Sequence, residues 1–500
     1  MITLNSAALE KLSGSRDLQI PAYEMAERRV GIVHFGVGGF HRAHQALYVD
    51  RLFNAGHSRD WAICGVGLMP GDARMRDALV NQDGLYTLVS KAPDGSREAR
   101  VIGSIAEYLF APDDPTAVLR RLSDPAVRIV SLTVTEGGYN YNPSTGEFQY
   151  ETPAVAADLA ADFSDGSAAP STMFGYVTEA LRRRREAGTA PFTVLSCDNV
   201  RGNGDLAKRM MLAYAERKDP ELARWIEAHV AFPNSMVDRI TPVTSEEDRA
   251  MVAQDYGIAD AWPVVSEDFL QWVVEDEFPA GRPAFEEVGV QMVSDVEPYE
   301  LMKLRLLNCS HQAIAYFGLL LGHTYAHEAV ADEDLVHFTR RLYMDGEGTP
   351  TIPPVPGIDL EAYKDQLIER FGNEHVRDTL ARLAAESSDR IPTWLVPVIR
   401  ENLAAGRDVS ASAAIVASWA RYAEGTGENG EQWPVVDRLR DRVMAAASRH
   451  DSDLLAFLRD GELFGDLVEH PAFVEPYTKA LTTLREQGAR ALLKVLGRSS

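Results

Sequence analysis

A lysine, an amide and an imidazole lie close together in one largely apolar segment, Tyr299 to His311. The segment has helical spacing, and at about 100° per residue Asn308 lies about 140° and His311 about 80° from Lys303. We therefore expect all three side chains on one broad side of a helix. These types suit alcohol oxidation, because a desolvated lysine can lose its proton and act as a base. An amide N–H can hold the alkoxide that forms, and an imidazole can orient a neighbouring hydroxyl.

The same three residues also fit a structural interpretation, with a snorkelling lysine, a capping amide and a hydrogen-bonded core histidine. Two further polar clusters interrupt strand-rich sequence, Cys197-Asp198-Asn199 and Asn234 to Arg239. Ordinary turn chemistry explains either cluster as well as a functional role does. Residue types alone leave both interpretations open.

A glycine-rich turn, Gly36-Val37-Gly38, follows one apolar run and precedes an amphipathic segment. Glycines in this context let backbone N–H groups approach a pyrophosphate at a helix N-terminus. The third glycine of the usual fingerprint is missing, because His41 stands there. Asp72 is the candidate acid for the adenosine ribose, although it lies farther on than the usual spacing of about 20 residues. A plain strand–turn–helix remains the alternative.

The elements that must position these residues alternate in the first half of the chain. Strand-like runs are Val30 to Phe35, Trp61 to Leu68, Leu85 to Val89, Val127 to Thr135 and Phe192 to Ser196. Helical patterns between them include Ala43 to Phe53, Tyr176 to Glu186 and Asp205 to Glu216. Strands alternating with helices predict an α/β fold with a mostly parallel, doubly wound sheet.

From about Tyr299 onward helical periodicity dominates, interrupted by the proline-rich segment Thr349 to Gly357. Helix-like runs are Leu360 to Phe371, Val376 to Ser387 and Ala411 to Glu424. We therefore expect a domain boundary near Ser294 and a mainly helical second half. A chain of 500 residues is long enough for two or three domains.

The composition, 45% hydrophobic and 25% charged, is that of a globular protein. A formal net charge of −24 argues against nucleic acid or a membrane surface as a partner. The N-terminus lacks the pattern of a signal peptide. The three cysteines, Cys64, Cys197 and Cys309, argue against a disulfide framework and a Cys-rich zinc site and favour a reducing cytoplasm. We expect a cytoplasmic monomer or weak oligomer.

Longer motifs carry a family resemblance. They are HFGVGGFHRAHQA (34–46), SLTVTEGGY (131–139), SCDNVRGNG (196–204), FPNSMVDRITP (232–242), KLRLLNCSH (303–311), VPGIDL (355–360) and RFGN (370–373). On these segments the chain resembles the mannitol dehydrogenase family of polyol-specific long-chain dehydrogenases. The motifs are spread over nearly the whole chain.

The resemblance implies an N-terminal Rossmann-type domain with additions, residues 1–293, and a C-terminal, mainly α-helical domain, residues 294–500, with the active site between them. It implies NAD-dependent oxidation of a polyol secondary alcohol to a ketose, with D-mannitol and D-fructose as the first candidates. It implies no metal, since lysine takes the place of a Lewis acid.

The resemblance also implies roles for single residues. Lys303 matches the general base, Asn199 and Asn308 the amides that stabilise the alkoxide, His311 a substrate-orienting imidazole, and Glu300 a carboxylate that helps the lysine exchange its proton. Substrate binding falls to Asp238, Arg382 and Arg390. Cofactor binding falls to Gly36, Gly38, Gly39, Phe40, Arg42 and Asp72.

Three positions depart from the family pattern. Cys309 stands where the family commonly has glycine, Arg390 stands where a lysine is expected, and the acidic pair after the second strand is reduced to Gly71-Asp72. One carboxylate remains to repel a 2′-phosphate, so NAD is favoured over NADP.

Three alternatives remain open. An arabinitol 4-dehydrogenase or a fructuronate reductase would keep the chemistry and change the substrate. In the fructuronate reductase alone, Arg382 and Arg390 would clamp a uronate carboxylate. A non-catalytic, nucleotide-binding redox sensor would keep only the fold. The intact Lys303, Asn308 and His311 argue against that sensor.

Overall fold

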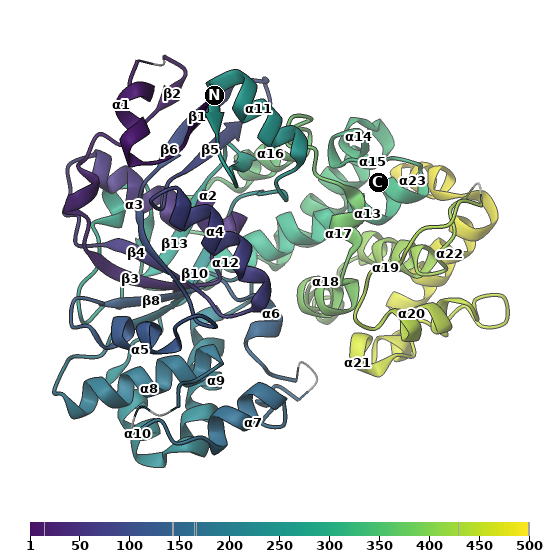
Figure 1. Cartoon of the computed structure of the whole chain (residues 1–500). Helices are drawn as coiled ribbons and strands as arrows, with labels where there is room; N and C mark the ends of the chain where they lie inside the picture. Colours follow the sequence, from purple (N-terminus) through teal and green to yellow (C-terminus); the bar gives the residue numbers. More distant parts are fainter. Residues whose placement is uncertain (15, 143–144, 165, 167, 429, 499–500) are drawn as a thin grey trace. The chain divides into compact units, whose positions relative to one another are not determined.

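The computed structural model describes residues 1–14, 16–142, 145–164, 166, 168–428 and 430–498. The chain divides into two compact units, Met1–Val296 and Glu297–Ser500. In Figure 1 the first unit runs from purple to teal and the second from green to yellow. Among the described residues, no helix combines the length and the apolar character needed to cross a bilayer.

The main sheet of unit 1 has five parallel strands in the order β7-β4-β3-β8-β9. Their bounds are β3 Val30–Phe35, β4 Ala62–Gly67, β7 Ile105–Phe110, β8 Ile129–Leu132 and β9 Thr193–Ser196. Counted along the chain, this is the strand order 3-2-1-4-5 of a Rossmann sheet. The prediction of a doubly wound parallel sheet is confirmed.

Both faces of this sheet are buried, which explains why its strands are continuous apolar runs. Ile32 of β3 belongs to one core cluster, with residues of α3 (Gln45–Asn54). Val33 and Phe35 belong to the other, with residues of α5 (Pro115–Ser123), α8 (Met173–Glu186) and α9 (Asn203–Lys218). Figure 1 shows α5, α8 and α9 with α10 (Pro220–His229) below the strands.

The strand predicted at Leu85 to Val89 is not part of the parallel sheet. It is β5 (Tyr86–Lys91), in a mixed sheet of order β12-β5-β6-β2 with Val264–Glu267, Arg97–Ile102 and Leu18–Gln19. β5 pairs antiparallel with β6, because a tight turn with Gly95 at φ +83° folds the chain back. A third sheet contains β10 (Ser235–Asp238), β13 (Gln271–Glu275) and β14 (Gln291–Val293).

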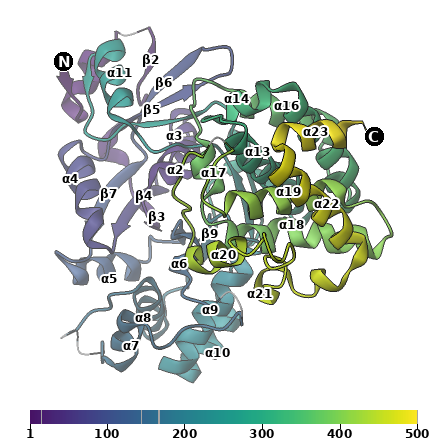
Figure 2. The same cartoon turned by 90° about the vertical axis from the view of Figure 1, so that its right-hand side faces the viewer.

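Unit 2 is built from helices, and Figure 2 shows them clearly. They include α12 Glu297–Met302, α13 Cys309–Leu320, α14 Ala326–Ala331, α15 Glu333–His337, α16 Leu360–Phe371, α17 Leu380–Ala384, α18 Ser387–Ala404, α19 Ser410–Tyr422, α20 Arg440–Ala447, α21 Gly461–Phe464, α22 Pro471–Gln487 and α23 Ala489–Gly497. The central α13 packs against α17 and α19, and α19 packs against α22. Two segments are π-helices, η5 (Lys303–Asn308) and η6 (Phe338–Gly348).

The helix predicted over Val376 to Ser387 is wrong for most of that range. Arg377 and Glu386 have positive φ angles of 54° and 52°, which interrupt a right-handed helix at both places. Between them the short α17 begins after Thr379, whose hydroxyl accepts a hydrogen bond from the Arg382 N–H at 3.4 Å. The predicted helix Leu360 to Phe371 is confirmed as α16.

Candidate functional site

The connections that follow β3, β4, β8 and β9 emerge at one edge of the parallel sheet. Strand order reverses between β3 and β8, and ligands of such folds bind outside the carboxyl ends of the strands at this switch point. The connections carry the glycine turn after β3, Asp72 after β4 and Asn199 after β9. The sheet thus brings three groups of predicted residues of unit 1 to one edge.

Gly36 occupies a position that only glycine fits. Its φ is +92°, and a Cβ there would lie 2.0 Å from the Thr133 carbonyl oxygen. The Thr133 hydroxyl in turn donates to the Gly36 carbonyl at 2.6 Å, which ties the turn after β3 to the connection after β8. Gly38 differs, because it is exposed and a Cβ would meet only the Gly36 oxygen at 3.9 Å. Gly36 shapes the turn, whereas Gly38 leaves its outer face open to a phosphate.

His41, which replaces the third glycine, is buried and lies flat on another imidazole. Its ring stacks on His34 with centroids 3.5 Å apart and planes 14° from parallel. His34 is fixed by hydrogen bonds to the hydroxyls of Ser131 at 2.8 Å and Thr133 at 2.9 Å. Burial lowers the pKa of His34 to about 3 and that of His41 well below its usual value. Two neutral, parallel rings provide the close helix–strand packing that a glycine usually gives.

Arg42 and Phe40, both predicted to bind the cofactor, make contacts within the protein. Arg42 is 1% exposed, and its guanidinium donates to the carbonyls of Gly38, at 3.3 Å, and Trp262. Burial lowers its pKa to about 10. Phe40 is partly buried and stacks on the His44 ring at 4.8 Å. Arg42 therefore stabilises the glycine turn from inside the fold. Its buried position favours this structural role over contact with a cofactor.

Asp72 stands at the end of a 3-10 turn, Pro70–Asp72, that follows β4. One of its carboxylate oxygens accepts a hydrogen bond from the Met69 N–H at 2.9 Å, which fixes the side chain. A Cβ on Gly67, the last residue of β4, would lie 2.7 Å from the Cβ of Asp72. A carboxylate held at the end of the second strand suits a ribose hydroxyl.

Two further predicted residues of unit 1 lie just after β9 and at the end of β10. Asn199 is exposed in the connection after β9, and Asp238 is the buried last residue of β10. The end of β9 is tied to the beginning of β10, because the Ser235 hydroxyl donates to the Ser196 carbonyl at 2.6 Å. Asn203 adds a second link by donating to the carbonyls of Asp198, at 3.0 Å, and Ser235, at 2.8 Å.

In unit 2, the predicted Lys–Asn–His segment is helical but not a regular α-helix. The residues from Lys303 to Asn308 form a π-helix, which continues into α13. A π-helix bonds residue i to residue i+5, so Asn308 returns much closer to the side of Lys303 than the α-helical angle of about 140° predicts. His311 lies three residues beyond Asn308 and so shares its face. The exposed fractions of Lys303, Asn308 and His311 are 6%, 3% and 9%.

Three buried polar atoms of this segment have no hydrogen-bond partner in the described part of the chain. They are Nδ2 of Asn308, Oγ of Ser310 and Nε2 of His311. A buried polar atom without a partner is costly, so its position usually reflects a function. Here an amide donor and a ring nitrogen, next to a buried lysine, offer hydrogen bonds to a ligand.

Arg382 and Arg390 lie near His311. The pKa of His311 is lowered well below its usual value, first by burial and then by the charges of Arg382, Arg370, Arg390 and Lys303. The imidazole is therefore neutral. Both carboxylate oxygens of Asp378 accept hydrogen bonds from Arg382 at 2.6 Å.

Sequence reasoning missed Arg370. It is buried at the end of α16 beside Phe371, whose ring lies 4.5 Å from that of His311. The RFGN motif contained both residues, but assigning Arg370 to the site needed the fold of unit 2.

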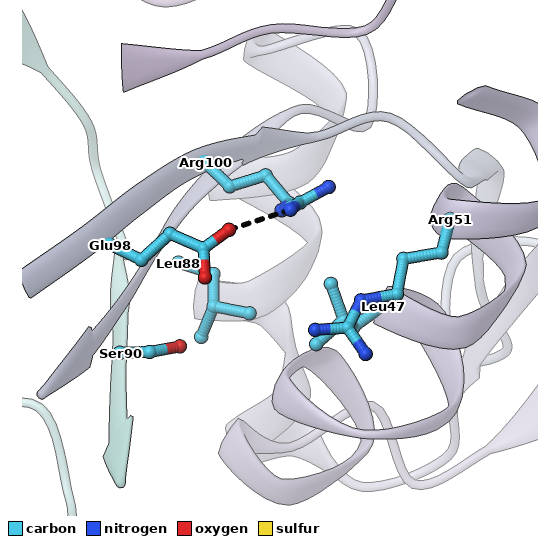
Figure 3. A pocket seen from close by; sticks show the side chains of 6 residues that line it. All are labelled: Leu47, Arg51, Leu88, Ser90, Glu98 and Arg100. Carbon is cyan, nitrogen blue, oxygen red and sulfur yellow. Dashed lines mark hydrogen bonds and ion pairs between the residues drawn. The ribbon is translucent and has the colours of Figure 1, made fainter. Parts of the chain in front are cut away.

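Two hollows in the described part of the chain are lined by none of the predicted site residues. One lies between α3 and the mixed sheet, where Arg51, Arg100, Glu98 and Ser90 surround a cavity of about 10 Å³ (Figure 3). This volume suits about one water molecule, and not a nucleotide or polyol. The other, of about 660 Å³, lies in unit 2 and includes Glu347 in its lining. The Glu347 carboxylate accepts hydrogen bonds from the N–H groups of Ala411 and Ser412 in the first turn of α19, so Glu347 caps this helix.

Comparison with known families identifies the chain. Residues 30–287 match the mannitol dehydrogenase Rossmann domain, and residues 295–485 match the mannitol dehydrogenase C-terminal domain. The chain belongs to the mannitol dehydrogenase family.

Individual members of the mannitol dehydrogenase family match over nearly the full chain. The mannitol 2-dehydrogenase of Phaeosphaeria nodorum is 45% identical over 496 residues, which cover 98% of this chain and 85% of that protein. The mannitol 2-dehydrogenase of Aspergillus fumigatus is 44% identical and covers 97% of both chains.

Two solved structures are also similar. One is the Pseudomonas fluorescens mannitol 2-dehydrogenase in a ternary complex with NAD and D-mannitol, with a TM-score of 0.91, 44% identity and full coverage of both chains. The other is a D-sorbitol dehydrogenase in substrate-free form, with a TM-score of 0.88, 39% identity, and coverage of 98% of this chain and 100% of that chain.

Within this mannitol dehydrogenase family member, Cys309 is fully buried. Burial raises the pKa of the Cys309 thiol to about 12, so the thiol is neutral. A hydrogen bond with the Tyr343 hydroxyl opposes this rise only in part. Tyr343 itself donates to the Arg305 carbonyl at 2.8 Å. Cys309 therefore packs in the interior of unit 2 as a small apolar residue.

Proposed function

We propose that the chain catalyses the NAD-dependent oxidation of a polyol secondary alcohol to a ketose, with D-mannitol and D-fructose as the physiological pair. The observation that carries this proposal is the buried Lys303–Asn308–His311 side of unit 2 in a chain that is 44% identical to the Pseudomonas fluorescens enzyme crystallised with NAD and D-mannitol. Family membership alone would leave the substrate open.

The carboxyl edge of unit 1 suits NAD. Exposed Gly36 and Gly38 leave their backbone open to a pyrophosphate, and Gly39 is the first residue of the short helix α2 (Gly39–Ala43). Asp72 would accept hydrogen bonds from the adenosine ribose and would repel the 2′-phosphate of NADP. When bound, NAD supplies the acceptor for the hydride that leaves the alcohol carbon.

Lys303 is proposed to take the alcohol proton. A general base must present a neutral amine, and Lys303 is buried beside the Asn308 and His311 side chains that would hold the substrate. The amide N–H of Asn308, which has no partner among the described residues, would donate to the oxygen as negative charge develops there, and Asn199 is proposed as the second such donor.

Glu300 precedes Lys303 by three residues on the same helical segment and is also buried. It is proposed to help the lysine exchange its proton with solvent. His311, held neutral, can accept or donate a hydrogen bond through Nε2 to orient a second hydroxyl of the substrate.

Asp238, Arg382 and Arg390 are proposed to hold the distal hydroxyls. The charge of Arg382 is already balanced by the bidentate pair with Asp378, with both bonds at 2.6 Å. A clamp for a uronate carboxylate would need that charge uncompensated. This pair therefore supports a neutral polyol over a hexuronate, while arabinitol remains a second polyol to test.

The proposal includes a cytoplasmic setting and a monomeric or weakly oligomeric enzyme that needs no metal ion and no nucleic-acid or membrane partner. The three free cysteines, all buried, support a reducing compartment.

Initial-rate kinetics test the function. We expect oxidation of D-mannitol with NAD to exceed that of arabinitol, sorbitol and mannonate in kcat/KM, and NAD to exceed NADP with each substrate. A higher kcat/KM for mannonate would replace the polyol assignment by the hexuronate one. No turnover of any of the four would refute the proposed function.

A further inference from the structure

Asp198, which the proposed mechanism does not use, joins two connections at the carboxyl edge of the parallel sheet. It follows β9, and its carboxylate accepts hydrogen bonds from the connection after β8. The N–H of Val134 donates to Oδ2 at 3.1 Å, and the N–H of Thr135 donates to Oδ1 at 2.7 Å. The side chain is 6% exposed, so these charge-assisted bonds are shielded from water.

The connection that Asp198 holds contains a strained residue. Thr135 has a φ of +62°, in the left-handed region, which is unusual for a β-branched side chain. Such a conformation persists only where the surroundings enforce it, and it is concentrated at functional sites. The hydrogen bond from its own N–H to Asp198 is one such constraint.

A buried tyrosine completes the arrangement. The Tyr139 hydroxyl donates to Oδ2 of Asp198 at 2.7 Å and lies 2.6 Å from the Ser196 hydroxyl. The main chain of Asp198 is fixed as well, since its N–H donates to the Ser196 hydroxyl at 3.3 Å. Its carbonyl accepts from the Asn203 amide at 3.0 Å. The adjoining residue, Asn199, is exposed at this edge.

We propose that Asp198 is a positioning residue, whose carboxylate ties the connection after β8 to the connection after β9 and thereby sets the place of the Asn199 amide. The inference rests on the proposed function, in which Asn199 stabilises the alkoxide. Asp198 itself need not touch the substrate or the cofactor. Its role is to keep the amide donor within the narrow geometry that alkoxide stabilisation requires.

The role gives a pH signature. Burial raises the pKa of Asp198 to about 6, against the lowering effect of Tyr139, Thr135 and Val134. The titratable groups that face it are Tyr139 and Cys197, whose pKa values are both raised, and Glu136, which opposes its ionisation. Protonation leaves a weaker acceptor for two N–H groups. We therefore expect kcat for polyol oxidation to fall below about pH 6 in the wild type.

Two variants test the role. Asp198→Asn should lower kcat by about 10- to 100-fold at pH 8, because a displacement of about 1 Å has effects of this size. It should also remove the part of the fall near pH 6 that depends on the Asp198 carboxylate, while NADH affinity and KM should change much less. Tyr139→Phe keeps the carboxylate but removes the hydrogen bond that lowers its pKa, so the fall should move to higher pH.

A matched control is Asp158→Asn. Asp158 is a buried aspartate of the same unit, 4% exposed, that accepts hydrogen bonds from four donor groups, the N–H and hydroxyl groups of Ser171 and Thr172. It should lower the melting temperature and leave kcat and its pH profile unchanged. If Asp158→Asn and Asp198→Asn have equal effects on kcat, or if Tyr139→Phe leaves the pH profile in place, the inference is wrong. Should Asp198→Asn not fold, the Tyr139→Phe profile decides alone. Failure of the proposed function itself would appear separately, as an absence of polyol oxidation by the wild type.

Discussion

Replacing Gly36 by alanine should damage both the fold of unit 1 and its affinity for NADH. The left-handed φ of +92° costs an L-residue about 1–2 kcal/mol. The new Cβ would stand 2.0 Å from the Thr133 carbonyl oxygen, and relieving such overpacking in a close-packed region typically costs about 1–3 kcal/mol. The expected destabilisation is about 2–5 kcal/mol, and at about 2–4 °C per kcal/mol the melting temperature should fall by roughly 4–20 °C.

Two further glycines make this prediction specific. Gly38→Ala has no close contact, since the nearest atom to its Cβ is 3.9 Å away, so it should leave the melting temperature nearly unchanged. It should still weaken NADH binding, because the new methyl group covers the face that a pyrophosphate approaches. Gly461→Ala in unit 2, where a Cβ meets nothing within 4 Å, should change neither quantity.

Differential scanning calorimetry and NADH fluorescence titration measure the two effects. Equal melting temperatures for Gly36→Ala and Gly38→Ala would refute the argument from the Thr133 contact. Unchanged NADH affinity in both variants would show that this turn does not bind the cofactor.

Three other substitutions have distinct expected results. Asp72→Ala should weaken NAD use and improve NADP use relative to it, and an unchanged ratio of kcat/KM for the two cofactors would mean that Asp72 does not face the ribose. Arg390→Ala should cost about 1–3 kcal/mol in kcat/KM on mannitol, whereas a larger loss on mannonate that salt weakens would favour a uronate substrate. Burial raises the pKa of Glu347 from 4.5 to about 8, so the folded state binds this proton more tightly than the unfolded state does. The stability it contributes is complete below about pH 4.5 and is lost as the pH rises to about 8. Melting temperatures of the wild type and Glu347→Gln across that range should therefore converge at low pH and diverge toward pH 8, and parallel curves would contradict the assignment.

The sequence predicted four strands of the parallel sheet, β3, β4, β8 and β9, because strands buried on both faces are continuous apolar runs, and it missed β7. The run at Val30 to Phe35 has the bounds of β3 itself. It did not predict that β5 belongs to a different sheet, because the sheet that a strand joins depends on residues far away in the sequence. The turn at Gly95 was the local signal for its pairing with β6.

The site was predicted less completely. Lys303, Asn308 and His311 were proposed from residue type and apolar context. Their predicted angular relation was wrong, because nothing local distinguishes a π-helix from an α-helix. Arg42 has the type expected of a phosphate ligand, and only the fold reveals that its guanidinium points inward to the Trp262 carbonyl. Asp198 resembled an ordinary turn residue until its hydrogen bonds with Val134 and Thr135 were known.

The role of Lys303 as the base is tested most directly by comparing Lys303→Ala with a second buried lysine. Lys364 is 1% exposed and donates to Glu361 at 2.6 Å, so Lys364→Ala removes a buried amine of unit 2 that makes structural ion pairs. With saturating NAD and mannitol, Lys303→Ala should lower the oxidation rate by several orders of magnitude, retain NADH binding, and recover part of the rate when a primary amine is added. Lys364→Ala should lower stability and keep the rate. A Lys303→Ala enzyme that retains most of its oxidation rate would contradict the mechanism.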